Sequence, residues 1–430
     1  MTPDWPIEKL EDLVESSRGI SYGIVQPGKH QPNGVPIIRV SDLKGNTVET
    51  MNPLRVSPEI EASYSRTRLR GGELIVSIVG TVGQTAIVDH SLAGWNVARA
   101  VAVIPVKEDV GPYWIRLALK GGPARAHIND RLNTTVQATL NLRDLASLPI
   151  LLPPASERNA IAATLGALDD KIELNRKMNA TLEAIARALF RDWFVDFGPT
   201  RAKMEGLAPY LSPDLWPLFP DRLDEEGKPE GWEVGTLSDL ATLNPESWTA
   251  RNAPETVAYV DLANTKWGSI DKVEHYAWTD APSRARRILR GGDTIVGTVR
   301  PGNGSFCYVG EDGLTGSTGF AVLRPKSPRD RAFVWCASTS GENIDRLAHL
   351  ADGGAYPAVR PDAVAATEVV IPSEVVLAAF RDAVSANIDL MVANKTESRT
   401  LAKTRDLLLP RLMSGELRVA DVEHIASEVA

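Results

Sequence analysis

The chain has 430 residues, with 47 basic and 55 acidic side chains, so its formal net charge is −8. This length allows two or three domains with hydrophobic cores, and the composition is that of an ordinary globular protein. No apolar run is long enough to cross a bilayer. Two cysteines, Cys307 and Cys336, are too few for a disulfide-stabilised secreted scaffold. We therefore expect buried thiols in a cytoplasmic protein. The negative net charge argues mildly against nucleic-acid binding, but it does not exclude local basic faces.

The clearest feature along the chain is an internal repeat. Residues Leu69–Val76 reappear as Leu289–Val296, and both copies continue through a glycine-rich turn into a short apolar strand. Further on, Leu140–Pro153 aligns with Val359–Pro372 at an offset of 219 residues. The offset is 220 residues in the first pair of segments and 219 in the second, and such nearly equal offsets indicate one unit of about 200 residues that has been duplicated.

In chain order, each copy begins with short β-rich runs bounded by glycine, aspartate or asparagine, such as Leu74–Val79 and Ala86–Val88. A short helix follows, over Pro112–Leu119 in the first copy and Arg331–Ser338 in the second. One long helix then closes each copy. We predict that the first long helix runs from Ser156 to about Val195, and that the second long helix ends near Gly415.

Both long helices carry a continuous 4-3-4-3 spacing of seam residues, which is typical of a coiled coil. The seam positions are Ile161, Leu165, Leu168, Ile172, Asn175, Asn179, Leu182, Ala186 and Leu189, then Phe380, Val384, Asn387, Met391, Asn394, Ser398, Leu401, Arg405 and Leu408. The middle of the seam is polar. Asn175, Asn179 and Asn394 are predicted to fix the helix register, unless the helices splay apart there and the asparagines face solvent. The carboxylates Asp169–Asp170 are expected in solvated or partner-facing positions.

Three stretches of the chain have a distinctive residue order. Residues 151–157, Leu-Leu-Pro-Pro-Ala-Ser-Glu, open the first long helix, and residues 229–234, Pro-Glu-Gly-Trp-Glu-Val, open the second copy. The most specific stretch is residues 189–206, Leu-Phe-Arg-Asp-Trp-Phe-Val-Asp-Phe-Gly-Pro-Thr-Arg-Ala-Lys-Met-Glu-Gly. With these stretches, the chain resembles the specificity subunit of type I restriction-modification enzymes. The chain departs from the family at Glu157-Arg158, where Glu-Gln is usual, and at Pro372, where a double proline is missing.

The resemblance implies an α+β fold with two repeated α/β target recognition domains. Two long antiparallel coiled-coil helices separate these domains, with pseudo-twofold symmetry. The corresponding segments are recognition domain 1 (1–153), the first long helix (154–196), a linker (197–231), recognition domain 2 (232–373), the second long helix (374–415) and a C-terminal tail (416–430).

The resemblance also implies a function. Each domain reads one half of a bipartite, asymmetric site on double-stranded DNA, and the helices set the unread spacer. Two modification subunits dock on the chain, bring S-adenosylmethionine and methylate adenine at N6. Restriction subunits add ATP- and Mg²⁺-dependent cleavage. The chain itself would be a non-catalytic subunit without a cofactor of its own.

Candidate DNA-contacting residues come from clusters at equivalent places in the two copies. Arg66, Arg68 and Arg70 precede the glycine pair of the first copy, and Arg284, Arg286, Arg287 and Arg290 precede that of the second. Alternate arginines on an extended segment share one face, and the guanidinium suits both phosphate and guanine. A solvated, salt-bridged face is the alternative interpretation.

Two further groups lie in the glycine turns, which ordinary hairpin turns explain equally well, and in the stretch before each long helix. Their members are polar or basic side chains able to reach phosphates or base edges: Gln84, Asn133, Gln137, Arg300, Asn303, Tyr356 and Arg360. Lys266 beside Trp267 could pin a DNA backbone, although a tryptophan is more often packed in a core.

Signals for catalysis are weak. The six histidines stand apart without metal-ligand spacing, and no phosphate-cradling glycine-lysine motif is present. Two competing functions remain open from the residues alone. The chain could be a protein-protein adaptor built on a coiled-coil rod, or an enzyme acting without partners.

Overall fold

The computed structural model describes residues 5–132, 138–354 and 356–421. Its internal contacts divide the chain into a first unit, Met1–Leu174 with Glu397–Ala430, and a second unit, Asn175–Thr396. Each unit therefore contains one end of both long helices, α5 (Ala155–Phe194) and α11 (Glu374–Met413). The predicted boundaries treat each helix as a segment of its own, and they remain a prediction.

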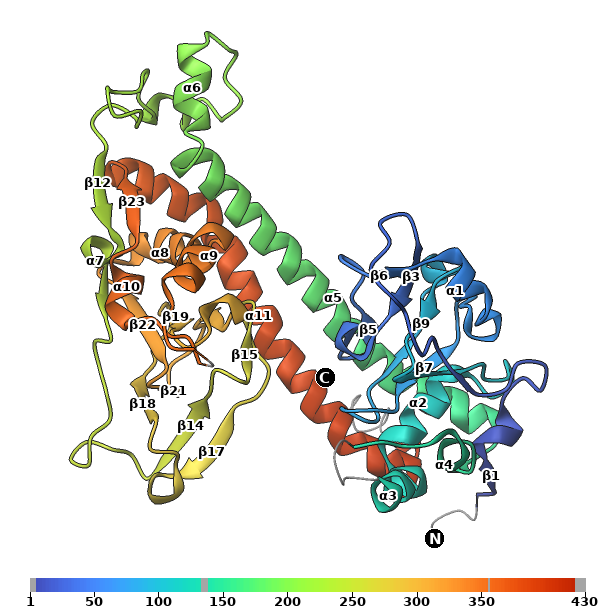
Figure 1. The fold of residues 1–430 in the computed structure, drawn as a ribbon. Helices are drawn as coiled ribbons and strands as arrows, with labels where there is room; N and C mark the ends of the chain where they lie inside the picture. The colour runs from blue at the N-terminus through green and yellow to red at the C-terminus, as the bar shows by residue number, and fades with distance from the viewer. Residues whose placement is uncertain (1–4, 133–137, 355, 422–430) are drawn as a thin grey trace. The chain divides into compact units, whose positions relative to one another are not determined.

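The first unit combines four small β layers with four short helices. Its main sheet has the order β2-β10-β7-β8, and two strand pairs are β4-β5 and β1-β11. Its second sheet has the order β6-β3-β9, and these three strands are labelled in Figure 1. The strands are β1 (Ile7–Lys9), β2 (Ser21–Tyr22), β3 (Val35–Ile38), β4 (Leu43–Lys44), β5 (Thr47–Val48), β6 (Leu54–Val56), β7 (Leu74–Ser77), β8 (Thr85–Ile87), β9 (Asn96–Val97), β10 (Val101–Ile104) and β11 (Pro149–Leu151). The helices are α1 (Pro58–Ala62), α2 (Pro112–Lys120), α3 (Gly122–Arg131) and α4 (Leu142–Ala146).

The second unit repeats this topology. Its main sheet is β13-β22-β19-β20, its second sheet is β17-β14-β21-β18, and β15-β16 and β12-β23 form the strand pairs. The strands are β12 (Glu233–Thr236), β13 (Ala241–Leu243), β14 (Thr256–Val260), β15 (Thr265–Lys266), β16 (Ser269–Ile270), β17 (Glu274–Ala277), β18 (Ala285–Ile288), β19 (Thr294–Gly297), β20 (Phe306–Tyr308), β21 (Leu314–Ser317), β22 (Phe320–Pro325) and β23 (Glu368–Ile371). The helices are α6 (Gly198–Met204), α7 (Leu237–Leu240), α8 (Arg331–Ser338), α9 (Gly341–Leu350) and α10 (Pro361–Ala365).

The parallel pairing inside the second sheets also repeats, between β3 and β9 and between β14 and β21. The duplication predicted from the sequence is therefore confirmed at the level of strand order. The second unit differs by one additional strand, β18, which pairs with β21.

Local sequence explains most element boundaries. Proline stands in the first turn of α2, where its missing N–H is not needed, and Gly415, at φ +70°, follows the end of α11. After α5, Phe197 adopts φ +54° and the chain turns into α6. The predicted limits of both long helices agree with the structure within two residues, and α8 begins and ends as predicted.

The seam residues pack inside the units as the heptad spacing predicts. In the first unit, Ile161 and Leu165 lie in one core with Leu412 of α11. In the second, Ala186 lies in a core with Phe380 and Val384. Within each unit the two helix segments run antiparallel, because contacts with later residues of α5 fall on earlier residues of α11. The predicted α+β fold with two long, pairing helices is confirmed.

Cys307 and Cys336 form no disulfide and are both buried. Burial raises the pKa of the Cys336 thiol to about 12, so this group stays protonated at neutral pH. In the part of the chain that the structure covers, no helix combines the length and the apolar character needed to span a bilayer.

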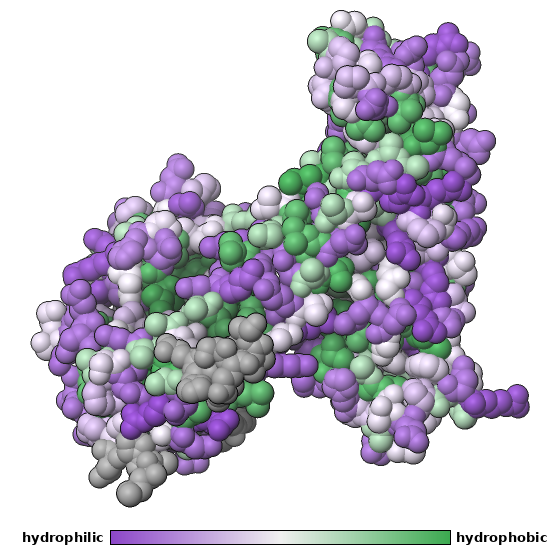
Figure 2. Space-filling model, turned by 180° about the vertical axis from the view of Figure 1, so that it is seen from behind, coloured by the Kyte–Doolittle hydropathy of each residue, from purple (hydrophilic) through white to green (hydrophobic). Residues whose placement is uncertain are grey.

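Polar side chains cover most of the face shown in Figure 2, with apolar groups visible between them. Two aromatic side chains of the second unit stand out by their exposure: 62% of Trp267 and 71% of Tyr356 are accessible to solvent. An exposed tryptophan loses the burial that normally stabilises it. The interpretation of Trp267 as a core residue is therefore wrong.

Candidate nucleic-acid interface

The three arginines predicted in the first unit differ in their surroundings. The Arg66 guanidinium donates to the Arg18 carbonyl over 2.7 Å. Arg68 donates from Nε to Glu61, whose carboxylate is 3% exposed, over 2.8 Å. The hydrogen bonds from Arg68 keep the pKa of Glu61 below its ordinary value, so the pair is charged at neutral pH. Arg70 is exposed. Arg66 and Arg68 thus have structural partners, and DNA contact by the three remains a prediction.

A buried carboxylate supports the glycine pair of the first unit. Glu73 accepts hydrogen bonds from the backbone N–H groups of Arg70 (2.8 Å) and Gly71 (2.9 Å). Arg18, itself 7% exposed, pairs with Glu73 over 2.7 Å. Buried charges are tolerated where they are paired and hydrogen-bonded. Glu73 and Arg18 therefore fix the shape of the turn from which Arg70 emerges.

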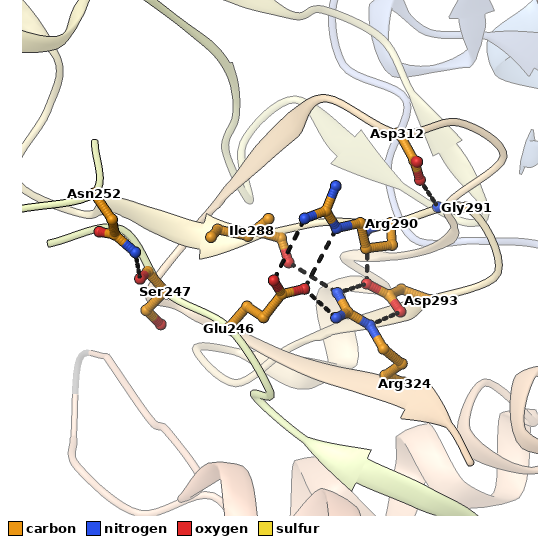
Figure 3. Close-up of polar contacts among 9 residues, drawn as sticks. All are labelled: Glu246, Ser247, Asn252, Ile288, Arg290, Gly291, Asp293, Asp312 and Arg324. Atoms are coloured by element: carbon orange, nitrogen blue, oxygen red, sulfur yellow. Dashed lines mark hydrogen bonds and ion pairs between the residues drawn. The ribbon is translucent and has the colours of Figure 1, made fainter. Parts of the chain in front are cut away.

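In the second unit two carboxylates share this role, because the Gly291 N–H donates to Asp312 over 2.8 Å and Asp293 holds the residue before it (Figure 3). Asp293 accepts from the Arg290 N–H over 2.8 Å and pairs with Arg324, which comes from β22 instead of the N-terminal segment. Arg324 also pairs with Glu246, and Arg290 reaches Glu246 over 3.3 Å. Sequence reasoning missed this network, although the shared acidic position after both glycine pairs was a usable signal.

The second predicted cluster lies on β18 and just before it. Arg284 is exposed, the Arg286 guanidinium lies 4.5 Å from the centre of the Trp278 ring, and Arg287 is half-buried. Burial lowers the pKa of Arg287, and its Nη1 donates to Ser247 over 3.3 Å. A register shift between residues 285 and 287 interrupts the strand alternation. The simple expectation of alternate arginines on one face therefore does not hold for this strand.

The structure brings together two predicted residues that lie far apart in the sequence. Arg300 follows β19, and Tyr356 precedes α10. The Arg300 guanidinium lies 4.6 Å from the centre of the Tyr356 ring, and both side chains are exposed. Asn303 is exposed on the same loop. A stacked arginine beside an aromatic ring is a common arrangement for binding nucleic acids.

The β15-β16 hairpin packs beside this loop. Lys266 donates from Nζ to Ser305 Oγ over 3.2 Å, and the Trp267 N–H donates to the Gly304 carbonyl over 2.7 Å. The Trp267 ring meets Phe306 edge-on, with 5.7 Å between the ring centres. We name Arg300, Asn303, Tyr356, Lys266 and Trp267 the loop cluster. It carries two cations and two exposed aromatic rings on one unit.

The remaining candidates are more scattered. Gln84 is half-buried, and its backbone N–H donates to Ser77 Oγ over 2.9 Å. Arg360 is exposed and stands at the N-cap position of α10, without a capping hydrogen bond from its side chain. Asn133 and Gln137 lie outside the described residues.

The seam asparagines hydrogen-bond across the two helices inside the second unit. Asn394 Nδ2 donates to Asn179 Oδ1 over 2.9 Å, and Asn179 Nδ2 donates to the Met391 carbonyl over 3.2 Å. Asn175, which is fully buried, donates to the Asn394 carbonyl over 3.4 Å. These bonds give a physical basis for the predicted register role, which itself stays a prediction.

The expectation of solvated carboxylates at Asp169–Asp170 holds for Asp170 and is wrong for Asp169. Asp169 is 6% exposed and pairs with Arg405 over 2.7 Å, with Arg116, and with the Tyr113 hydroxyl over 2.9 Å. Burial alone would raise the pKa of Asp169, but the hydrogen bond from Arg405 and the charge of Arg116 outweigh it and lower the pKa. The network lies wholly in the first unit. Over the described ranges, no group of three His, Cys, Asp or Glu side chains is arranged to hold a metal ion.

Comparison with known proteins agrees with this architecture. The model of the type I restriction modification DNA specificity domain matches residues 3–184. The EcoBI specificity subunit of Escherichia coli is 31% identical over 195 residues, which cover 43% of this chain and only 41% of that subunit. The MjaIX specificity subunit of Methanocaldococcus jannaschii is 24% identical over 440 residues, covering 97% of this chain and 95% of that one.

A solved structure has a similar fold over the same extent. The S subunit of a type I restriction-modification system from M. genitalium superposes with a TM-score of 0.52 at 16% identity, covering 96% of this chain and 99% of that one. The first part of this chain thus matches the DNA specificity domain of type I restriction modification, and the whole chain is similar to specificity subunits of type I restriction enzymes.

Proposed function

We propose that the chain is the DNA-reading subunit of a type I restriction-modification enzyme, with one unit reading each half of a bipartite, asymmetric site. The observation that supports this most is the repetition of one sheet topology in two units of a chain whose residues 3–184 match a DNA specificity domain. Each unit also presents an exposed arginine directly before its glycine pair, Arg70 in the first and Arg290 in the second.

The rest of the proposal concerns partners. Two modification subunits would dock on the long helices and the domain flanks, bring S-adenosylmethionine and methylate adenine at N6. Restriction subunits would add ATP- and Mg²⁺-dependent cleavage. The helices α5 and α11, each unbroken over 40 residues, would set the spacer between the half-sites. The chain would contribute recognition without catalysis, in the cytoplasm.

Binding of the assembled methyltransferase to DNA is expected to weaken steeply with salt, because phosphate contacts release counterions. For six to ten contacts the loss between 50 and 200 mM salt is on the order of a thousandfold or more. Replacing Arg284 and Arg286 by alanine should weaken binding further and flatten the salt dependence. Arg287 is left intact because it is half-buried. Gel shifts over a salt series measure both effects.

The matched control is Arg222→Lys, an exposed arginine of the 197–231 segment that pairs with Glu230. Salt-independent binding would contradict the DNA-reading proposal. Unchanged affinity in the Arg284 and Arg286 variant would remove only these two residues from the interface.

A further inference from the structure

Arg300 holds a backbone conformation that disfavours any side chain. Its φ is +47°, and its N–H donates to the Pro357 carbonyl over 2.7 Å. The first unit has Gly80 at the same place, with φ +81° and its N–H donating to the Ala138 carbonyl over 2.8 Å. The left-handed region is costly for residues with a Cβ and cheap for glycine. The second unit therefore keeps an arginine where its own duplicate uses the residue that the backbone favours.

A second strained residue lies in the same loop cluster. Trp267 has φ +45° and is 62% exposed, and its ring lies so close to Gly304 that a Cβ there would come within 2.5 Å of the indole. In the described part of the chain, four non-glycine residues have positive φ, and two of them belong to this cluster. Backbone strain of this kind persists where surrounding structure enforces it, and it concentrates at ligand-binding sites.

The loop itself also differs between the units. Equivalent backbone hydrogen bonds close it, from Gly297 to Ser305 over 2.7 Å and from Ser77 to Gln84 over 2.8 Å. The loop spans residues 297–305 in the second unit and residues 77–84 in the first, so the second unit has an insertion of one residue here. The longer loop presents the exposed Asn303 next to Arg300. Gly80 has no side chain to take the place of Arg300, so the first unit lacks this arginine.

The chemistry of the arrangement favours a base over a phosphate. A phosphate contact needs only positive charge, which an arginine or lysine in an unstrained position supplies. The Arg300 guanidinium instead lies over the Tyr356 ring, 4.6 Å from its centre, and this contact restricts where the guanidinium can point. A planar fork held in one orientation matches the O6 and N7 acceptors of guanine in the major groove.

We infer that Arg300, positioned by Tyr356, recognises a guanine in the half-site read by the second unit, and that the first unit has no equivalent contact. This inference rests on the proposed function and identifies a specificity-determining residue within it.

The test uses methyltransferase assembled with the full chain and a pool of duplex DNA of randomised sequence, with the bound molecules sequenced. In Arg300→Gly, the preference for guanine at one position of one half-site should fall roughly ten- to hundredfold, while the other half-site keeps its preferences. The melting temperature should stay equal or rise, because glycine adopts this φ without strain. Arg300→Lys should lose the same preference although it keeps the charge.

Tyr356 has its own pair of variants. Tyr356→Phe retains the ring and should retain the guanine preference, whereas Tyr356→Ala should lose it. Arg222→Lys, far from the cluster in sequence and paired with Glu230, should leave the selected sequence unchanged.

Three outcomes would overturn the inference. If Arg300→Gly weakens binding to all sequences alike and lowers the salt slope by about one, with lysine restoring both, Arg300 contacts a phosphate. If Arg300→Gly lowers the melting temperature and leaves the preference intact, the arginine is structural. If wild-type methyltransferase selects no sequence at all, the proposed function fails, and the inference fails with it.

Discussion

Replacing Asp169 by alanine is expected to destabilise the first unit by about 3–5 kcal/mol, because removal of one partner leaves buried charges uncompensated. Arg116 and Asp169 are both 6% exposed on their side chains, and Arg405 is 18% exposed. The three side chains come from α2, α5 and α11, so the loss loosens the packing of all three helices. Chemical unfolding followed by hydrogen exchange in the first unit separates this effect from unfolding of the second.

The contribution of Asp169 also has a predictable pH dependence. Its pKa is lowered in the folded chain, so the stabilisation is present above the unfolded pKa of about 3.9 and is lost as the pH falls through the folded value. The difference between wild type and Asp169→Ala should therefore be full at pH 7 and shrink below about pH 4.

The control is Lys171→Ala, which breaks the exposed pair with Glu397 on the same two helices. Such pairs contribute about 0–1 kcal/mol. Equal losses in the two variants would show that Asp169 acts as an ordinary surface charge, against its burial in the structure.

Replacing Phe194 by alanine is expected to cost the second unit about 3–5 kcal/mol. The side chain is 4% exposed and makes ring contacts with five other aromatic residues. Phe333 and Phe380 lie at 5.0 Å between ring centres, in edge-on geometry. Such pairs stabilise beyond the area that they bury. Hydrogen exchange should show the loss in residues 175–396 and not in the first unit.

Val195→Ala is the matched control, because Val195 follows Phe194 directly and is 40% exposed. Its truncation should change the free energy of unfolding by no more than about 0.5 kcal/mol. A loss of similar size in both variants would mean that the aromatic cluster does not carry the packing of this unit.

The large-scale architecture could be predicted because it follows from periodic patterns. The 219-residue offset predicts the duplication, and the structure repeats the order β2-β10-β7-β8 as β13-β22-β19-β20. The heptad spacing predicts both 40-residue helices, since burying a seam requires apolar residues at regular intervals. These features depend on many residues at once, so a local exception does not erase them.

Interactions between distant segments could not be predicted. Asp169 is one acidic residue on a charged helix, and only the packing of α2 and α11 against α5 shows that it is buried with two arginines. The anchoring arginine is Arg18 in the first unit and Arg324 in the second, at unrelated places in the repeat. The stack of Arg300 on Tyr356 joins residues 56 positions apart. No pattern within a copy encodes such pairings.

Exchange of one recognition domain tests the central claim most directly. Residues 1–153 are replaced by the corresponding domain of another family member, with α5 and the second unit unchanged, and the methylated motif is determined by sequencing the DNA of cells that carry the assembled methyltransferase. If each unit reads one half-site, one half of the motif changes while the other half and the spacer length stay as they were. A motif in which both halves change, or in which neither does, would contradict the account.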